Sequence, residues 1–307
     1  MLTLAAALLL SPVSTPVELT STPAALHGTL LTPEGQSRAA AVILPGSGPT
    51  DRDGNSGQFG IRASTYRLLA EGLAERGVAS IRIDKRGIAG SATAATSEAD
   101  LRFNTYVDDA RAWATKAATQ TGQPCAWLIG HSEGALVALA AVAENDDRIC
   151  GLVLLSGAGR PAATVLREQL AALPEPLKTQ AYEALSELEA GRTAADPPAE
   201  LAAMFRPSVQ PYMISWLALD PASLAAAYDG PVFVGQGTTD LQVSVADAEA
   251  IKAAQPRATL VVWDGANHVL KTAPADRAAN VATYMDPALP LAPGVVEAVA
   301  DFILKPR

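Results

Sequence analysis

The chain has 307 residues, of which 49% are hydrophobic, 18% charged and 5% aromatic, which is typical of a globular protein with a sizeable core. Lys and Arg number 23 against 32 Asp and Glu, so the formal charge at neutral pH is −9. Nucleic-acid affinity comes mostly from basic side chains that neutralise phosphates, so this balance argues against nucleic acid and anionic lipid as partners. Two cysteines and three histidines are too few for an ordinary structural zinc site, and we expect no metal.

The N-terminus is apolar over a short stretch. Residues 2–10 have the composition of the apolar region of a signal peptide, and residues 11–15 that of a small-residue cleavage zone, although a positively charged start and an A-x-A site are missing. We expect residues 1–15 to be a leader and the protein to be exported, to the periplasm or the medium, with a cytoplasmic protein as the alternative. No apolar run reaches the ~18 residues that cross a bilayer, so no membrane span is expected.

Strand and helix patterns alternate along the rest of the chain. Strands are predicted at 17–20, 26–31, 39–44, 78–84, 126–130, 151–155, 231–235 and 259–263, and helices at 64–76, 106–118, 133–144, 247–254 and 295–304. Most of the strands are apolar runs without polar alternation, which suits strands buried on both faces of a sheet. This order predicts an α/β fold with a mostly parallel central sheet and helices on both faces.

The segment between the sixth and seventh predicted strands carries no strand pattern. Its apolar residues recur at helical spacing, and it is far longer than the dozen or so residues that a crossover between parallel strands needs. Ligands bind at the carboxyl edge of such sheets, so we interpret residues 158–229 as a helical cap over that edge. A helical decoration remote from any site is the alternative. Residues 16–157 and 230–307 then form the core.

The two cysteines precede two of the predicted strands. Cys125 stands before the run at 126–129, and Cys150 before the run at 151–155. Adjacent strands lie ~4.8 Å apart, which suits a disulfide between the two residues. Two buried thiols that pack as small apolar groups are the alternative. A disulfide would fit an oxidising compartment and so favour export.

The sharpest motif is the pentapeptide at residues 130–134, Gly-His-Ser-Glu-Gly. It follows a predicted strand and opens a predicted helix, which is the context of a nucleophile elbow. The elbow places its serine in a strained turn, where flanking glycines let the backbone approach closely. We therefore predict Ser132 as a nucleophile, with the Glu133 N–H pointing at a developing oxyanion.

A serine hydroxyl needs a base to take its proton, and the chain has three histidines. His131 lies inside the elbow and is expected to pack in the core, and His27 lies on the first predicted strand pair. His268 follows the last predicted strand, at the edge where the elbow opens. We predict His268 as the base.

An acid must orient the imidazole and stabilise its charged form. Asp240 follows the strand at 231–235, and the chain order Ser132, Asp240, His268 is the order that accompanies a nucleophile elbow of this kind. Asp264 is the rival, but it precedes the histidine by only four residues and is expected to cap the turn. We predict Asp240 as the third member.

A second oxyanion donor is expected after the first long buried strand, in the turn at residues 45–48, Pro-Gly-Ser-Gly. The Ser47 N–H is predicted as this donor, with Gly46 or Gly48 as the alternatives one position away.

Five blocks in the same order carry a family resemblance. They are 46–55 (GSGPTDRDGN), 84–91 (DKRGIAGS), the elbow, 237–243 (GTTDLQV) and 267–268 (NH). Over residues 16–307 the chain resembles α/β-hydrolase-fold serine hydrolases, and more narrowly bacterial esterases of the serine-aminopeptidase-like S33 group. The resemblance implies hydrolysis of carboxylic esters, a small-molecule substrate, no cofactor and a cap over the pocket. The chain departs from the commoner His-Gly opening of the oxyanion turn by carrying Pro45-Gly46.

Other functions fit this sequence less well. A peptidase of the same fold would use acidic cap residues to hold a free amino group, a lyase or C–C hydrolase would use the same triad, and a binding protein would lack a triad member. The elbow carries Ser rather than Asp, which argues against a dehalogenase or epoxide hydrolase.

Two charged blocks have no catalytic role here. Asp84 and Arg86 are expected to pair and fix their loop, and residues 51–53 either brace the oxyanion turn or rim the pocket. The oligomeric state is not predicted.

Overall fold

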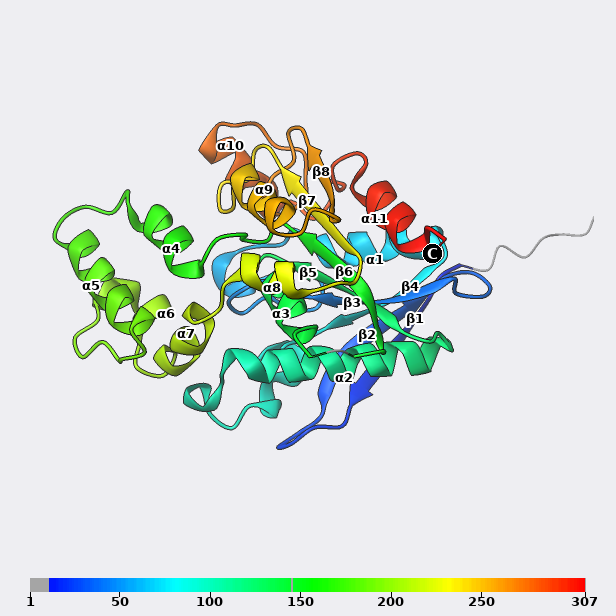
Figure 1. Cartoon of the computed structure of the whole chain (residues 1–307), viewed down its shortest axis with the longest axis horizontal. Helices are drawn as coiled ribbons and strands as arrows, with labels where there is room; N and C mark the ends of the chain where they lie inside the picture. Colours follow the sequence, from blue (N-terminus) through cyan, green and yellow to red (C-terminus); the bar gives the residue numbers. More distant parts are fainter. Residues whose placement is uncertain (1–10, 145, 307) are drawn as a thin grey trace, which may run out of the picture.

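A computed structural model describes residues 11–144 and 146–306 (Figure 1). Its strands are β1 (Val13–Leu19), β2 (Leu26–Thr32), β3 (Ala39–Leu44), β4 (Val78–Ile83), β5 (Ala126–His131), β6 (Ile149–Leu155), β7 (Val232–Gly237) and β8 (Thr259–Trp263). Its α-helices are α1 (Thr65–Glu75), α2 (Phe103–Thr121), α3 (Glu133–Ala141), α4 (Ala162–Leu170), α5 (Leu177–Glu189), α6 (Ala202–Phe205), α7 (Gln210–Leu217), α8 (Pro221–Ala227), α9 (Val245–Ala254), α10 (Arg277–Ala282) and α11 (Val295–Leu304).

The eight strands form one sheet in the order β1-β2-β4-β3-β5-β6-β7-β8. Only β2 runs antiparallel to its neighbours, β1 and β4, and the other pairs are parallel. The predicted mostly parallel α/β sheet is confirmed. Because β3 lies between β4 and β5, the strand order reverses there, and the loops after β3 and β5 open at the place where such sheets bind ligands.

Successive residues of the central strands pack on opposite faces of the sheet. In β3, Val42 and Leu44 belong to the core beneath α2, α3 and α9, whereas Ala41 and Ile43 belong to the core beneath α1 and α11. Both sets are buried, which explains why the strand sequence shows no polar alternation. The two helical layers are visible on either side of the sheet in Figure 1.

The first strand begins earlier than predicted. β1 starts at Val13 and pairs antiparallel with β2, so residues 13–15 of the expected leader lie in the sheet. Val13 and Thr15 are β-branched, which suits an edge strand, and the Thr32 hydroxyl donates a hydrogen bond to the Val13 carbonyl. The apolar part of the expected leader, residues 2–10, falls outside the described residues.

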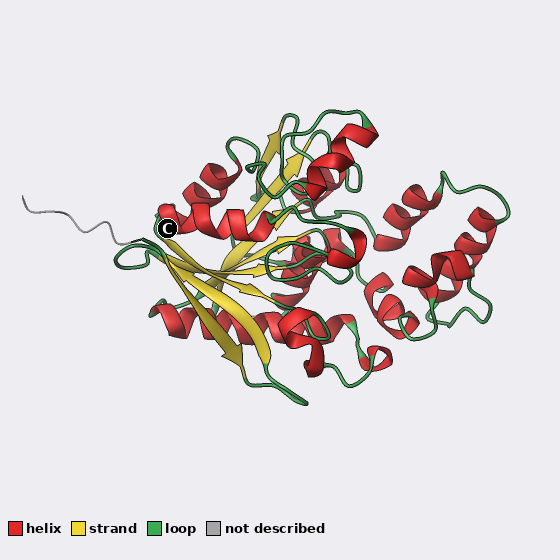
Figure 2. Cartoon of the chain, turned by 180° about the vertical axis from the view of Figure 1, so that it is seen from behind, coloured by secondary structure: helices red, strands yellow, loops and turns green. Residues whose placement is uncertain are grey.

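The segment between β6 and β7 is helical and contains α4 to α8. Helices α4 to α7 share a hydrophobic cluster of their own and stand beside the sheet rather than over its faces (Figure 2). Helix α8 differs, because Ala225 is buried in the main core and its carbonyl accepts a hydrogen bond from Gln255 beyond α9. The part of the expected cap that stands apart from the core therefore ends before α8.

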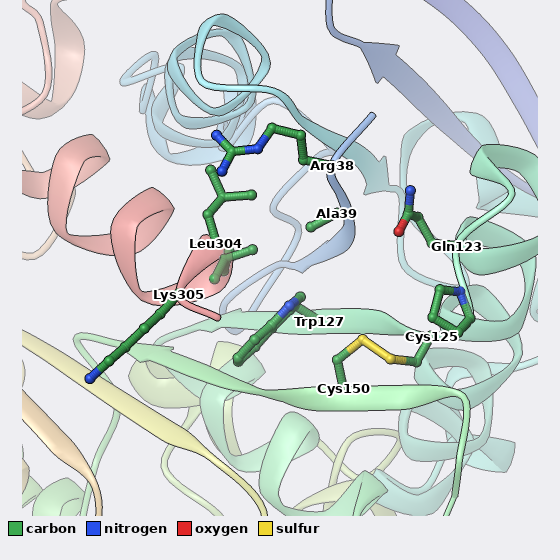
Figure 3. A pocket seen from close by; sticks show the side chains of 10 residues that line it. Arg38, Ala39, Gln123, Cys125, Trp127, Cys150, Leu304 and Lys305 are labelled. Atoms are coloured by element: carbon green, nitrogen blue, oxygen red, sulfur yellow. A yellow bond between two sulfur atoms is a disulfide. The ribbon is translucent and has the colours of Figure 1, made fainter. Parts of the chain in front are cut away.

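Cys125 and Cys150 form a disulfide at the start of β5 and β6, with Cα atoms 5.3 Å apart. The disulfide and Trp127 line a cavity of about 370 Å³ at the amino ends of these strands (Figure 3). This cavity lies at the opposite edge of the sheet from the loops that follow β3 and β5. None of the helices within the described residues is long and apolar enough to cross a membrane.

Candidate active site

Ser132 occupies a strained turn between β5 and α3. Its backbone adopts φ 54° and ψ −121°, a conformation that non-glycine residues rarely take. The neighbouring glycines permit the turn: a Cβ on Gly130 would lie 2.1 Å from the Gly134 carbonyl oxygen, and one on Gly134 would lie 2.4 Å from that of Leu44. The Ser132 side chain is therefore presented at the carboxyl edge of the sheet, and the residue is half-buried.

Asp240 and His268 meet at the same edge, from the loops after β7 and β8. The imidazole Nδ1 lies 2.9 Å from Asp240 Oδ2 and 3.1 Å from Oδ1, and both side chains are almost fully buried. The carboxylate also accepts hydrogen bonds from the backbone amides of Gln242 and Val243 and from the Gln236 side chain. Burial alone would raise the pKa of Asp240, but the nearby His268 and these amides outweigh it and lower that pKa. Asp240 is thus held as an anion facing His268.

The loop that carries His268 is fixed through its neighbour Asn267. The Asn267 amide group donates to Asn280 and to Thr283, and its oxygen accepts from the Lys271 backbone. The Thr65 hydroxyl, at the start of α1, donates to the Val269 carbonyl on the other side of the histidine. Both flanks of His268 are therefore held by buried hydrogen bonds.

His131 connects the elbow to this loop. Its Nε2 lies 2.7 Å from the His268 carbonyl oxygen, which can only accept, so Nε2 carries the proton. Its Nδ1 then accepts from the Tyr66 hydroxyl at 2.9 Å, and the two imidazole rings lie 4.9 Å apart between centroids. Burial, assisted by His268, lowers the pKa of His131 to about 3, so it stays neutral. His131 is a packed core residue, as predicted, and it ties the residue next to Ser132 directly to His268.

The turn after β3 lies against the elbow. A Cβ on Gly46 would lie 3.2 Å from the Ser132 Cβ, which shows how closely the two loops approach. The Gly46 N–H donates to the Tyr66 hydroxyl, whereas the Ser47 N–H has no acceptor within the described residues. The Glu133 N–H is the first amide of α3 and has no acceptor within the helix. Of the predicted donors and their alternatives, Ser47, Glu133 and Gly48 therefore keep amides without an acceptor among the described residues, and Gly46 does not.

The ion pairs beside the turn differ from those predicted. Asp84 and Arg86 do not pair with each other: Asp84 accepts from Arg52 and from the Gly90 amide, and Arg86 forms a two-point contact with Asp109 of α2. The prediction was wrong because both partners come from segments distant in sequence, which only the folded loop path brings near. Both pairs nevertheless fix the loop.

The charged block at residues 51–53 braces the oxyanion turn. Arg52 reaches Asp84, Asp53 contacts Arg82 of β4, and Asp51 accepts hydrogen bonds from the amides of Asp53 and Asn55. Of the two roles considered for this block, the structure therefore favours bracing. The rival acid Asp264 is exposed and accepts a hydrogen bond from Thr238, within the turn.

Two residues of the site had no predicted role. Tyr66 joins the Gly46 amide to His131, and Lys85 donates from Nζ to the Gly46 carbonyl oxygen at 2.6 Å. Tyr66 lies on the apolar face of α1, where an aromatic residue is ordinary core. Lys85 lies in the block 84–91 that carries the resemblance. A lysine is usually exposed, so nothing in the sequence indicated that this one is buried beside the elbow. Within residues 11–144 and 146–306, no group of three or more His, Cys, Asp or Glu could hold a metal ion.

Comparisons with known proteins agree with the fold. The family described as serine aminopeptidase, S33, matches residues 59–189. Among solved structures, Est1E from Butyrivibrio proteoclasticus is 18% identical with a TM-score of 0.58, over 94% of this chain and 97% of that one. A lipase-esterase related protein from Clostridium acetobutylicum is 16% identical with a TM-score of 0.55, over 91% and 99%. A Pyrococcus furiosus esterase is 21% identical with a TM-score of 0.52, over 84% and 83%. A search of curated proteins gives no match.

The strand order, the elbow and these similarities lead to one conclusion about architecture. The chain has the α/β-hydrolase fold, and between residues 59 and 189 it resembles the S33 serine aminopeptidase family, as its sequence blocks indicated.

Proposed function

We propose that this protein is a serine hydrolase that cleaves carboxylic esters of small to medium acyl chain. The observation that carries the proposal is the strained Ser132 turn beside a buried Asp240–His268 pair, with His131 hydrogen-bonded to the His268 backbone between them. A hydroxyl, an imidazole and a carboxylate in this order have the roles of nucleophile, base and orienting acid. The Ser132 hydroxyl makes no hydrogen bond within the described residues. A hydrogen bond between a nucleophile and its base is often long in the free enzyme and shortens when substrate binds.

The first half of the reaction acylates the enzyme. His268 Nε2 takes the proton of Ser132 as Oγ attacks the ester carbonyl carbon, and the carbonyl electron pair moves to oxygen. The N–H groups of Glu133 and Ser47 stabilise that oxyanion, and the first turn of α3 adds its positive end. The intermediate then collapses: the oxyanion electron pair reforms the carbonyl, the bond from the acyl carbon to the alkoxy oxygen breaks, and His268 gives its proton to that oxygen, so that the alcohol leaves and the acyl group stays on Ser132 Oγ. Asp240 stabilises the imidazolium throughout.

The second half releases the acid by the same groups. Water loses a proton to His268 and attacks the acyl carbon, and the second oxyanion occupies the same two amides. Collapse of this intermediate expels Ser132 Oγ, which regains its proton from His268. No step needs a cofactor.

The helical insertion is proposed to cap the substrate pocket. It leaves the sheet after β6 and returns at β7, so it emerges next to the elbow and next to the Asp240 loop. Tyr212 of α7 is buried against the core that holds α3. Substrate choice would then depend on the side chains of the insertion rather than on the sheet.

The peptidase alternative gains no support from the insertion. A grip on a free amino group is strong only where an acid is both unpaired and shielded from water, but Glu175, Glu187 and Glu189 contact Lys178, Arg192 and Arg167. The other acids considered, Glu183, Asp196 and Glu200, are exposed. A non-enzymatic binding protein is also less well supported, because all three triad residues are present.

The test is hydrolysis of p-nitrophenyl esters from acetate to long-chain acyl groups by the wild type and by Ser132→Ala. We expect a short- to medium-chain optimum and a fall in kcat of roughly 10⁵-fold or more in the variant, because the nucleophile is lost. Aminoacyl p-nitroanilides run in parallel measure the peptidase alternative. Unchanged ester hydrolysis in Ser132→Ala would exclude this serine as the nucleophile.

We also propose export. A disulfide joins Cys125 and Cys150, and disulfides persist mainly in oxidising compartments. The apolar N-terminus supports the same view. Fractionation of expressing cells, with thiol counting of the recovered protein, tests it: protein confined to the cytoplasm with two free thiols would contradict export.

A further inference from the structure

Lys85 is a buried lysine beside the elbow, and the mechanism above does not use it. It is 8% exposed and lies directly after β4, at the carboxyl edge of the sheet. Its Nζ donates to the Gly46 carbonyl oxygen at 2.6 Å and lies 3.6 Å from Glu133 Oε1. A buried ammonium is costly unless it is paired and hydrogen-bonded, so the two contacts explain how it is tolerated there.

The first contact bears on one oxyanion donor. The Gly46 carbonyl and the Ser47 N–H belong to the same planar peptide unit, in which they point in opposite directions. An ammonium that holds the carbonyl oxygen therefore fixes the direction of the N–H and polarises it. Tyr66 holds the Gly46 amide on the other side of the same residue at 2.9 Å. The Ser47 N–H, which has no acceptor among the described residues, thus belongs to a peptide fixed on both sides.

The second contact bears on the other donor. Glu133 offers its backbone N–H as the first amide of α3, and its side chain, 4% exposed, faces Lys85. Holding the carboxylate restrains the residue whose amide must meet the oxyanion. The same ammonium therefore contacts the peptide group that carries the Ser47 N–H and the side chain of Glu133, whose N–H is the other donor.

Lys85 is buried, and among the described residues the carboxylate beside it is that of Glu133. Its Nζ lies 5.5 Å from the centre of the Tyr106 ring of α2. Tyr212 of α7 is buried near Glu133, and burial, followed by the charge of this carboxylate, raises the pKa of the Tyr212 hydroxyl. At a buried site water screens charges less than at the surface, so the ammonium and the carboxylate act more strongly on the two peptide groups than exposed charges would.

We infer that Lys85 is a positioning residue that sets the two oxyanion donors, Ser47 N–H through the Gly46 carbonyl and Glu133 N–H through its carboxylate. This rests on the proposed function and adds a residue to its machinery. The contacts of Lys85 are with the groups that carry the donors, Gly46 and Glu133, and with the Tyr106 ring. Its effect should appear on the charge that develops in the transition state and not on substrate binding.

The test replaces the pair by uncharged residues of similar size, Lys85→Met with Glu133→Gln, so that neither charge is left alone in the core. We expect kcat for a p-nitrophenyl ester to fall roughly 10- to 100-fold with KM nearly unchanged, because one donor is worth about 10²–10³ and here neither is deleted. Inhibition by a trifluoromethyl ketone, whose adduct with Ser132 places an oxyanion in the same hole, should weaken by a similar factor.

The matched control is the neighbouring pair, Arg86→Met with Asp109→Asn. This pair is also buried and also fixes the 84–91 loop, with side chains 13% and 11% exposed, but it contacts neither Gly46 nor Glu133. We expect it to lower the melting temperature and to leave kcat near that of the wild type. Equal losses of kcat in both double variants would reduce Lys85 to a structural ion pair and overturn the inference.

The outcomes separate this inference from the proposed function. A wild type inactive on all esters would overturn both. If the wild type is active and Ser132→Ala is not, the proposed function stands. An unchanged kcat in the folded Lys85 double variant would then overturn the inference alone.

The pH profile of the single variant Glu133→Gln is a second test, made under conditions in which this variant is folded, because it leaves Lys85 without its charged partner. Burial lowers the pKa of Lys85 and Glu133 opposes this, so removing the carboxylate lowers that pKa further. Among the groups that face Lys85, the Tyr106 ring and the Gly46 carbonyl carry no charge to compensate. The basic limb of kcat should then move to lower pH, and an unmoved limb with wild-type kcat would overturn the inference.

Discussion

The carboxyl edge of the sheet and helix α5 of the insertion use polar residues in opposite ways. At the sheet edge, Asp240, His268 and His131 are buried and bonded to partners from other elements. On α5 of the insertion, the ion pairs lie at the surface and stay within the insertion, as in the pairs of Glu187 with Arg192 and of Glu189 with Arg167. The first arrangement fixes atoms in place, since a buried polar group without its partner is costly, and the second leaves the surface free to vary.

This contrast explains how one fold can keep its chemistry while its substrate changes. The proposed catalytic groups are held by the core, and the insertion packs around a hydrophobic cluster of its own that includes Leu185 and Phe205. Changes in the insertion should therefore alter specificity before they alter the reaction. The following variants are chosen to break or sharpen that distinction.

The largest effect is expected from Asp240→Asn. The amide keeps the size of the side chain but no longer stabilises the charged imidazole or fixes its tautomer, so kcat/KM for a p-nitrophenyl ester should fall roughly 10⁴-fold. The low pKa of Asp240 means that the wild-type group stays ionised over the working range. Asp264→Asn, the rival acid in its exposed turn, is the control and should keep wild-type activity. The reverse pattern would assign the acid to Asp264.

Those parts of the site that depend on local sequence could be predicted. Apolar runs bounded by glycine and proline located most strands, and the pattern at 259–263 and at 295–304 matches β8 and α11. The elbow needs glycines at fixed positions, and the acid and base follow consecutive strands of a parallel sheet, whose carboxyl ends must share one edge. Position along the chain was therefore enough to predict that Asp240 meets His268 and that Ser132 lies at the same edge of the sheet.

Parts that depend on the path of the loops could not be predicted. Arg52 reaches Asp84 and Arg86 reaches Asp109 across loop and helix, and no spacing in the sequence relates these pairs. The role of Tyr66 was hidden for a different reason: one hydroxyl on an apolar helix face gives no sign of what it will meet. In the insertion, helical periodicity indicated helices, but the return of α8 to the core depends on contacts with α3 and α9.

A smaller effect, on stability, is expected from His131→Asn. Burial holds the pKa of His131 at about 3 in the folded chain against 6.5 for the free group, so between these values the unfolded chain binds a proton that the folded chain does not. Stability should therefore fall as pH drops from 6.5 towards 3, by an amount on the order of 4 kcal/mol from this residue. Urea unfolding across this range should show a flatter pH dependence in the variant, which also loses stability at neutral pH.

The control for this experiment is His27→Asn on the first strand pair, whose side chain is 35% exposed. It should keep the wild-type dependence on pH. If His131→Asn also kept the wild-type dependence of stability on pH, the loss of stability in acid would come from groups other than His131.

The smallest effect is expected from Glu187→Gln on α5. The carboxylate contacts Arg192 at 2.7 Å, but the two side chains are 44% and 62% exposed, and water and salt screen such pairs. Melting temperature and kcat/KM should both match the wild type. Leu185→Ala on the same helix provides the contrast, because that side chain is fully buried and its truncation costs about 2–5 kcal/mol where the site cannot collapse. A loss in Glu187→Gln as large as in Leu185→Ala would mean that the insertion, like the sheet edge, depends on its polar contacts.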